Sequence, residues 1–181
     1  HFSEVFSDQE EVRHEHDLIA EIWNGGLAEK NALEILESLG YQEAEETLRR
    51  LHSLNSSARY QQLPEPSRQR FDALMPMVIV QVAQGRHPEI TLMRVSDLLD
   101  SICRRASYLA LLAEYPAALN MLIRLAGASP WLMQYLTQHP ILLDELLDSD
   151  SLYAEPDFAA MRDELKRQLI TIMNLNKDRW N

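Results

Sequence analysis

The sequence predicts an all-α protein, a compact irregular bundle of about eight to ten helices. Aliphatic residues recur at spacings of three and four, the period of an amphipathic helix, and the sequence lacks an alternating strand pattern. Hydrophobic residues make up 46% of the 181 residues and charged residues 25%, which is typical of a chain that buries a core. Several prolines precede short apolar runs, which predicts short proline-started helices within 116–147.

The first third of the chain predicts three helices. One is expected over 9–23, ending at Asn24-Gly25-Gly26. The next two, 29–39 and 43–54, form an antiparallel hairpin around the stop at Gly40. On the polar side of 43–54, two acid–base pairs stand four residues apart, Glu45 with Arg49 and Glu46 with Arg50.

The stretch 55–66 is rich in residues that interrupt helices and is the best candidate for a boundary. It would divide an acidic helical hairpin appendage, 1–54, from a helical bundle, 65–181. One continuous domain remains the alternative.

Longer helices are expected on both sides of the proline-rich part. The ranges are 67–84, where Pro76 should introduce a kink, 89–105 and 157–173. The inward-facing residues of the first two are predicted to be Phe71, Leu74, Met75, Val78, Val82, Leu92, Val95, Leu98, Leu99 and Ile102.

Between them, the short helices are expected at 116–126, 130–138 and 140–147. Proline suits the first position of a helix because the missing N–H there has no partner within the helix. Ser129 is predicted to cap the second of these helices, and His139 to act as a capping or turn residue before Pro140.

The net charge of −11 is concentrated at the front of the chain. Residues 1–46 hold thirteen acidic and two basic residues, whereas the remainder holds fifteen of each. Such a charge opposes nucleic acids and anionic membranes, and the longest apolar runs fall far below the ~20 residues that cross a bilayer. We therefore expect no nucleic-acid or membrane partner and a cytoplasmic location. A helix-turn-helix DNA binder fits the hairpin spacing but not its charge.

Cys103 is the single cysteine and lies within an apolar pattern, so a buried thiol is expected rather than a nucleophile. The chain begins at His1 rather than Met, and we expect it to be a piece of a longer protein or a processed product.

Other candidates for chemistry are weak. His14 and His16 are two residues apart, which places them on different faces of a helix rather than together on a metal. Gly25-Gly26 follows a helix and does not form a phosphate-binding loop. The triplet Asp148-Ser149-Asp150 ends a leucine-rich helix, so a solvated turn is favoured over a Mg²⁺ site. The sequence therefore predicts no catalytic, cofactor-binding or metal-binding residue.

Two further groups have ordinary structural explanations. Arg104 and Arg105 before Tyr108 are too few for a nucleic-acid surface, and ion pairing with acidic helices is the expected role. Trp131 and Tyr135 stand four residues apart and are expected to be core residues, with interface anchors as the alternative.

Two runs of sequence resemble a known family. They are RRASYLALLAEYPAAL, residues 104–119, and the stretch from ASPWL at 128–132 to HPILLDELLD at 139–148. Together they resemble the central region of the bifunctional glutamine synthetase adenylyltransferase/adenylyl-removing enzyme. The resemblance is strongest over 104–148 and fades beyond about 165.

The resemblance implies a helical part between two nucleotidyltransferase domains, which use ATP and Mg²⁺ and act on glutamine synthetase. In that family the middle part is associated with regulation by the PII signal protein and glutamine. The family's Gly-Ser pair is absent here, so no catalytic residue is carried over. The resemblance thus implies a non-catalytic regulatory or spacer segment. The alternative is a free-standing acidic helical adaptor, which the coding frame on either side of the segment would distinguish.

Overall fold

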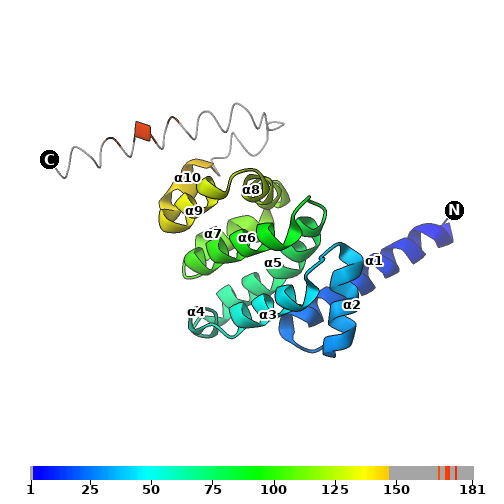
Figure 1. Cartoon of the computed structure of the whole chain (residues 1–181). Coiled ribbons are helices and arrows are strands. Elements are labelled where there is room, and N and C mark those ends of the chain that lie inside the picture. Colours follow the sequence, from blue (N-terminus) through cyan, green and yellow to red (C-terminus); the bar gives the residue numbers. More distant parts are fainter. Residues whose placement is uncertain (1, 147–166, 168–169, 172–173, 175–181) are drawn as a thin grey trace. The chain divides into compact units, whose positions relative to one another are not determined.

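A computed structural model describes residues 2–146, 167, 170–171 and 174. The chain divides into two compact units, His1–Leu143 and Asp144–Asn181. The described part of the first unit is helical throughout its regular structure (Figure 1), which confirms the predicted all-α class. Its helices are α1 (Phe2–Asn24), α2 (Glu29–Leu39), α3 (Ala44–Asn55), α4 (Ala58–Gln61), α5 (Glu65–Ala83), α6 (Pro88–Ile102), α7 (Ala106–Glu114), α8 (Pro116–Ala128), α9 (Pro130–Gln138) and the 3₁₀ helix η1 (Pro140–Leu142). Helix α10 (Leu143–Leu146) begins at the last residue of this unit.

Several helix ends match their sequence signals, whereas α1 begins at Phe2 rather than at residue 9. Gly40 ends α2 with a positive φ of 120°, and the backbone N–H of Tyr41 donates to Leu36 O at 3.1 Å. The Ser129 hydroxyl accepts from the N–H of Leu132 at 3.3 Å, as expected for a cap of α9. His139 lies at the junction of α9 and η1, confirming its position at a turn.

Three local predictions need correction. The breaker-rich stretch 55–66 contains a short helix, α4, because the Ser57 hydroxyl accepts from the N–H of Tyr60. The single helix expected over 140–147 begins instead as a 3₁₀ turn in Pro140–Leu142. Helix α7 was not predicted as a separate element. The helix expected over 157–173 falls largely outside the described residues.

The core of the first unit is built around α5, which packs against α1, α6, α7 and α8. All ten of the predicted inward-facing residues of α5 and α6 are buried. Pro76 lies inside α5, where its missing N–H leaves the carbonyl of Asp72 without the usual helical donor.

An aromatic cluster joins α1, α4 and α5. The rings of Trp23, Tyr60 and Phe71 pack with centroids 5.4–5.6 Å apart. Asp72 Oδ1 accepts hydrogen bonds from the Trp23 indole, at 2.8 Å, and from the Tyr60 hydroxyl. Residues on both sides of 55–66 therefore share one packed cluster within His1–Leu143.

Two further side chains tie the hairpin of α2 and α3 to the helices behind it. Tyr41 is 1% exposed, and its hydroxyl donates to the carbonyl of Ile79 at 2.7 Å. Glu89, in the first turn of α6, accepts from the backbone N–H groups of Gln42 and Glu43 ahead of α3. A side chain from one helix thus satisfies amides at the start of another.

Within the described residues, no single helix is long and apolar enough to cross a membrane. The pair α7 and α8 passes that test together on length and composition, but it is bent by 100° at its junction.

Candidate functional site

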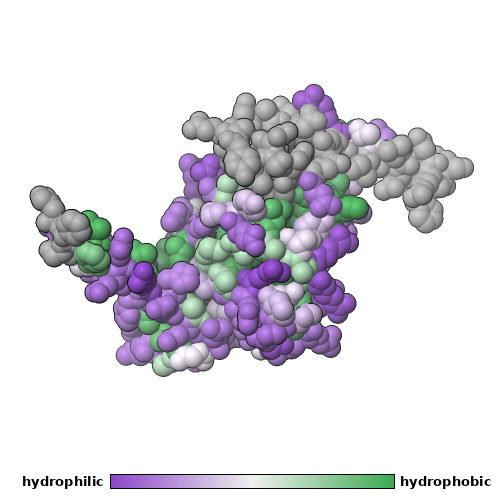
Figure 2. All heavy atoms as spheres, turned by 180° about the vertical axis from the view of Figure 1, so that it is seen from behind, coloured by the Kyte–Doolittle hydropathy of each residue, from purple (hydrophilic) through white to green (hydrophobic). Residues whose placement is uncertain are grey.

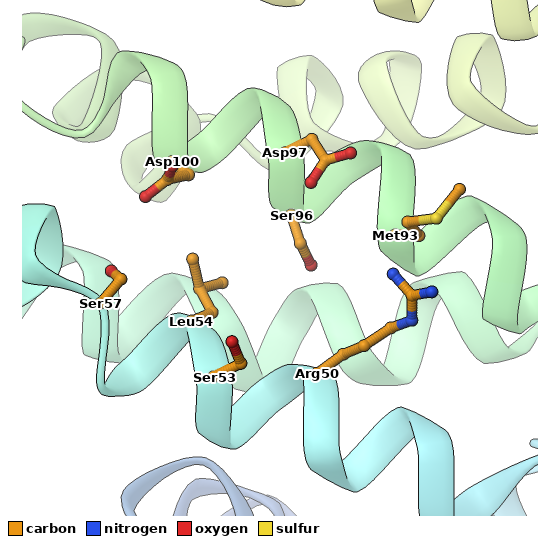
Figure 3. A pocket seen from close by; sticks show the side chains of 8 residues that line it. All are labelled: Arg50, Ser53, Leu54, Ser57, Met93, Ser96, Asp97 and Asp100. Carbon is orange, nitrogen blue, oxygen red and sulfur yellow. The ribbon is translucent and has the colours of Figure 1, made fainter.

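Charged and hydroxyl side chains line a cleft between α3 and α6. It is open to solvent and has a volume of about 220 Å³. Figure 3 shows that the Ser53 and Ser96 side chains point into it from opposite walls, with the Arg50 guanidinium at one end. We call it the α3–α6 cleft; its lining residues are Arg50, Ser53, Leu54, Ser57, Met93, Ser96, Asp97 and Asp100.

Charges of both signs border the α3–α6 cleft. Asp97 and Asp100 lie one turn apart on α6, and Asp100 Oδ2 accepts from the Arg59 guanidinium at 3.4 Å. Asp100 Oδ1 is buried and has no donor among the described residues. Partial burial raises the pKa of Asp97, an effect that Arg50 opposes and Asp100 reinforces.

The polar groups that line the α3–α6 cleft are of three kinds. They are the hydroxyls of three serines, the carboxylates of Asp97 and Asp100 and the guanidinium of Arg50, while Leu54 and Met93 supply the apolar part of the lining. Across the described residues, no group of three or more His, Cys, Asp or Glu side chains is placed to hold a metal ion.

A larger cavity, with a volume of about 640 Å³, lies where the turn between α5 and α6 meets α8. His87, one of the isolated histidines of the sequence, lines it together with Arg86 and Asn120. Its lining comes from the end of α5, the turn, the start of α6 and the second half of α8, so it is a recess of mixed polarity where three helices meet.

The histidines and the thiol lie where the sequence places them. His14 and His16 are both exposed on α1. Cys103 is fully buried, and its thiol donates to the carbonyl of Asp100 at 3.2 Å. The burial of Cys103 confirms the predicted buried thiol, and this burial raises the pKa of the thiol. Asp148-Ser149-Asp150 lies outside the described residues.

The aromatic and basic candidates differ in part from expectation. Arg105 lies over the ring of Tyr108, 5.5 Å from its centroid, a cation–π contact rather than the expected ion pair with an acidic helix. Trp131 is 48% exposed, so the prediction of a core residue is wrong for it. Because Pro130 starts α9 at the surface, Trp131 packs against Tyr135 on the outside of the helix, with centroids 5.7 Å apart.

Sequence reasoning missed the α3–α6 cleft. Asp97 and Asp100 share the polar side of a helix, which alone predicts only a solvated face. Their neighbour Arg50 is 47 residues away from Asp97, so only the packing of α3 against α6 brings these groups together.

Comparison with known proteins gives one consistent result. No family model matches the chain. It is 43% identical over 169 residues to the bifunctional glutamine synthetase adenylyltransferase/adenylyl-removing enzyme of Chromobacterium violaceum, covering 93% of this chain. The corresponding enzyme of Aromatoleum aromaticum is 46% identical over 172 residues, and that of Nitrosococcus oceani 38% over 176.

The chain matches one segment of this bifunctional enzyme family. This confirms the family resemblance seen in the sequence. The chain covers 19% of the length of the Chromobacterium enzyme and 18% of the length of the other two. It therefore spans about a fifth of the length of these curated relatives. The matched stretch includes far more than residues 104–148, because 93–95% of the chain aligns with these three relatives.

Proposed function

We propose that the chain is a non-catalytic helical regulatory and spacer segment of an enzyme that adenylylates and deadenylylates glutamine synthetase. The observation that carries this proposal is the match of more than nine-tenths of the chain to about a fifth of such bifunctional enzymes. The two activities, with their ATP and Mg²⁺, then belong to flanking nucleotidyltransferase domains, and glutamine synthetase is the substrate of the parent polypeptide in the cytoplasm.

The packing of the described residues supports a structural role. The inward positions of α5 and α6 are occupied by apolar side chains, and the polar groups of the α3–α6 cleft suit binding. A rigid bundle between two opposing activities holds them at a defined separation. If the bundle has two packings, it also biases which activity reaches the substrate.

Within this proposal, the segment couples the parent enzyme to nitrogen signals through the PII protein and glutamine. A signal that binds one packing of the bundle more tightly shifts the balance between the two activities by the difference in affinity.

The catalytic part of the proposal is tested by AMP transfer. The isolated chain, mixed with glutamine synthetase, ATP and Mg²⁺, is expected to transfer no AMP above a control without the chain. The full-length parent serves as the positive control. AMP incorporation that depends on the isolated chain would overturn the proposed non-catalytic role.

The regulatory part is tested by titrating labelled PII against the isolated chain with and without glutamine. We expect binding that glutamine changes, together with slower amide exchange at a defined set of residues. PII binding to the full-length parent but not to the chain, at any glutamine concentration, would place the regulatory site elsewhere.

A further inference from the structure

The first two-thirds of α1 has no cover within the described part of the chain. Residues 4–17 are all exposed, whereas Ile19, Ile22 and Trp23 are at most 1% exposed. Figure 1 shows this part of α1 extending away from α2, α3 and α5. An isolated helix of this length is only marginally stable in water, so most of its stability must come from packing.

Two apolar residues of the exposed part continue the line of the buried Ile19 along the helix. Val5 and Val12 are 57% and 65% exposed, and each stands seven residues from the next member of the series Val5, Val12, Ile19. Seven residues are almost two helical turns, so the three side chains lie within about 40° of one another around the axis. The apolar surface on the projecting end of α1 is visible in Figure 2.

An acidic row runs beside this face. Glu4, Asp8, Glu11 and Glu15 follow one another at intervals of four, three and four residues, which places them along one side of the helix. All four are exposed. The projecting part therefore presents an apolar stripe with a continuous negative border.

We infer that this stripe of α1, Val5 and Val12 with the acidic row beside it, is a docking face for another part of the parent polypeptide. The occupant is a helix or surface patch with its own apolar stripe, bordered by Lys or Arg residues that meet the acidic row. This inference rests on the proposed function, since the chain spans only about a fifth of its relatives and the occupant lies in the remainder.

Charge argues against a second copy of this chain as the occupant. Residues 1–46 carry thirteen acidic and two basic residues, so two such faces would bring rows of like charge together. Like charges across an interface disfavour association, whereas a basic border is attracted to the acidic row.

The inference is tested by thiol labelling in the isolated chain and in the full-length parent. Single substitutions Val5→Cys and Val12→Cys probe the stripe. Ser7→Cys and His14→Cys are the matched controls, because they lie on the opposite side of the same helix and are also exposed. Labelling is followed peptide by peptide with mass spectrometry, so that Cys103 and other cysteines are distinguished.

In the full-length parent we expect Val5→Cys and Val12→Cys to label at least about tenfold more slowly than in the isolated chain, whereas the controls change by less than about twofold. Adding Glu11→Lys and Glu15→Lys to the parent should restore fast labelling at Val12→Cys, because the basic border is then repelled. Equal labelling of the stripe in both proteins would overturn the inference, as would a dimer of the isolated chain that Val12→Asp dissociates. Both results are independent of the AMP-transfer assay that tests the proposed function.

Discussion

At the scale of single residues, Trp23 connects parts of the chain that are far apart in sequence. Its ring packs on Tyr60 and Phe71, and its indole N–H binds Asp72, 49 residues away. Burial and the adjacent Asp72 carboxylate raise the pKa of Tyr60 well above its ordinary value.

Replacing Trp23 tests how much this cluster contributes to stability. We expect Trp23→Ala to lower the free energy of unfolding by about 3–5 kcal/mol, because it leaves a large cavity and removes one of the two donors to Asp72. Trp23→Phe keeps most of the ring contacts and should cost about 1–2 kcal/mol. Urea unfolding followed by far-UV circular dichroism measures both. A loss below 1 kcal/mol in Trp23→Ala would show that the cluster is not a stabilising centre.

Glu89 makes stability depend on pH. Burial raises its pKa, but hydrogen bonds from the backbone amides of Glu89, Glu43 and Gln42 outweigh this effect and hold the pKa below the ordinary value. An acid with a lowered folded-state pKa stabilises the fold above its unfolded pKa of about 4.3, and this contribution disappears as pH falls through the folded value.

We accordingly expect Glu89→Gln to reduce the free energy of unfolding by on the order of 1 kcal/mol at pH 7. The difference from the unmodified chain should shrink as the pH falls below about 4. Glu29→Gln, another acid in the first turn of a helix, serves as the control. A Glu89→Gln difference of the same size at pH 3 and pH 7 would contradict a role for the charge.

At the scale of elements, the turn between α2 and α3 depends on a backbone conformation that side chains disfavour. Gly40 has a φ of 120°, and a Cβ added there would lie 3.4 Å from the carbonyl oxygen of Ala83. Gly40→Ala is expected to cost about 1–2 kcal/mol of stability. In Gly26→Ala, a Cβ would make ordinary contacts of 3.9–4.0 Å with Glu21, so a change below about 0.5 kcal/mol is expected. Thermal unfolding measures the stability of the two variants in parallel. An equal loss of stability in both would contradict a special requirement for glycine at position 40.

A comparison of the helices with the predicted ranges shows which sequence signals were sufficient to predict helix boundaries. Helices with a clear apolar stripe and a definite stop, such as α2 before Gly40 and α9 after Ser129, were predicted within about two residues. Helix α4 was missed because its four residues are too few for a periodic pattern. Glu46 pairs with both Arg49 and Arg50, the first at three residues instead of the predicted Glu45–Arg49 pair at four. Helical spacing allows both partners, and side-chain rotamers decide between them.

The α3–α6 cleft and the exposure of Trp131 could not be predicted from the sequence pattern of single helices. Both depend on which helix faces lie against one another, and that arrangement joins residues tens of positions apart. The amphipathic pattern of one helix states which face is buried but not what covers it.

At the scale of the whole molecule, the unit His1–Leu143 contains helices on both sides of 55–66. We expect a chain ending at Leu143 to unfold in one cooperative transition, with the same urea midpoint for Trp23-dominated fluorescence and for helical circular dichroism. Residues 1–143 contain two tryptophans, Trp23 and Trp131. The experiment therefore uses a variant with Trp131→Phe, so that the fluorescence reports on Trp23. Two separate midpoints would instead support an independent appendage over 1–54.

Helix α5 packs against α1, α6, α7 and α8, and it meets α1 in the cluster around Trp23. A force applied to the projecting end of α1 would therefore reach α7 and α8 through a single intervening helix. Because only α5 lies between them, we expect a contact made on the projecting end of α1 to affect the packing of α7 and of α8, which begins at Pro116.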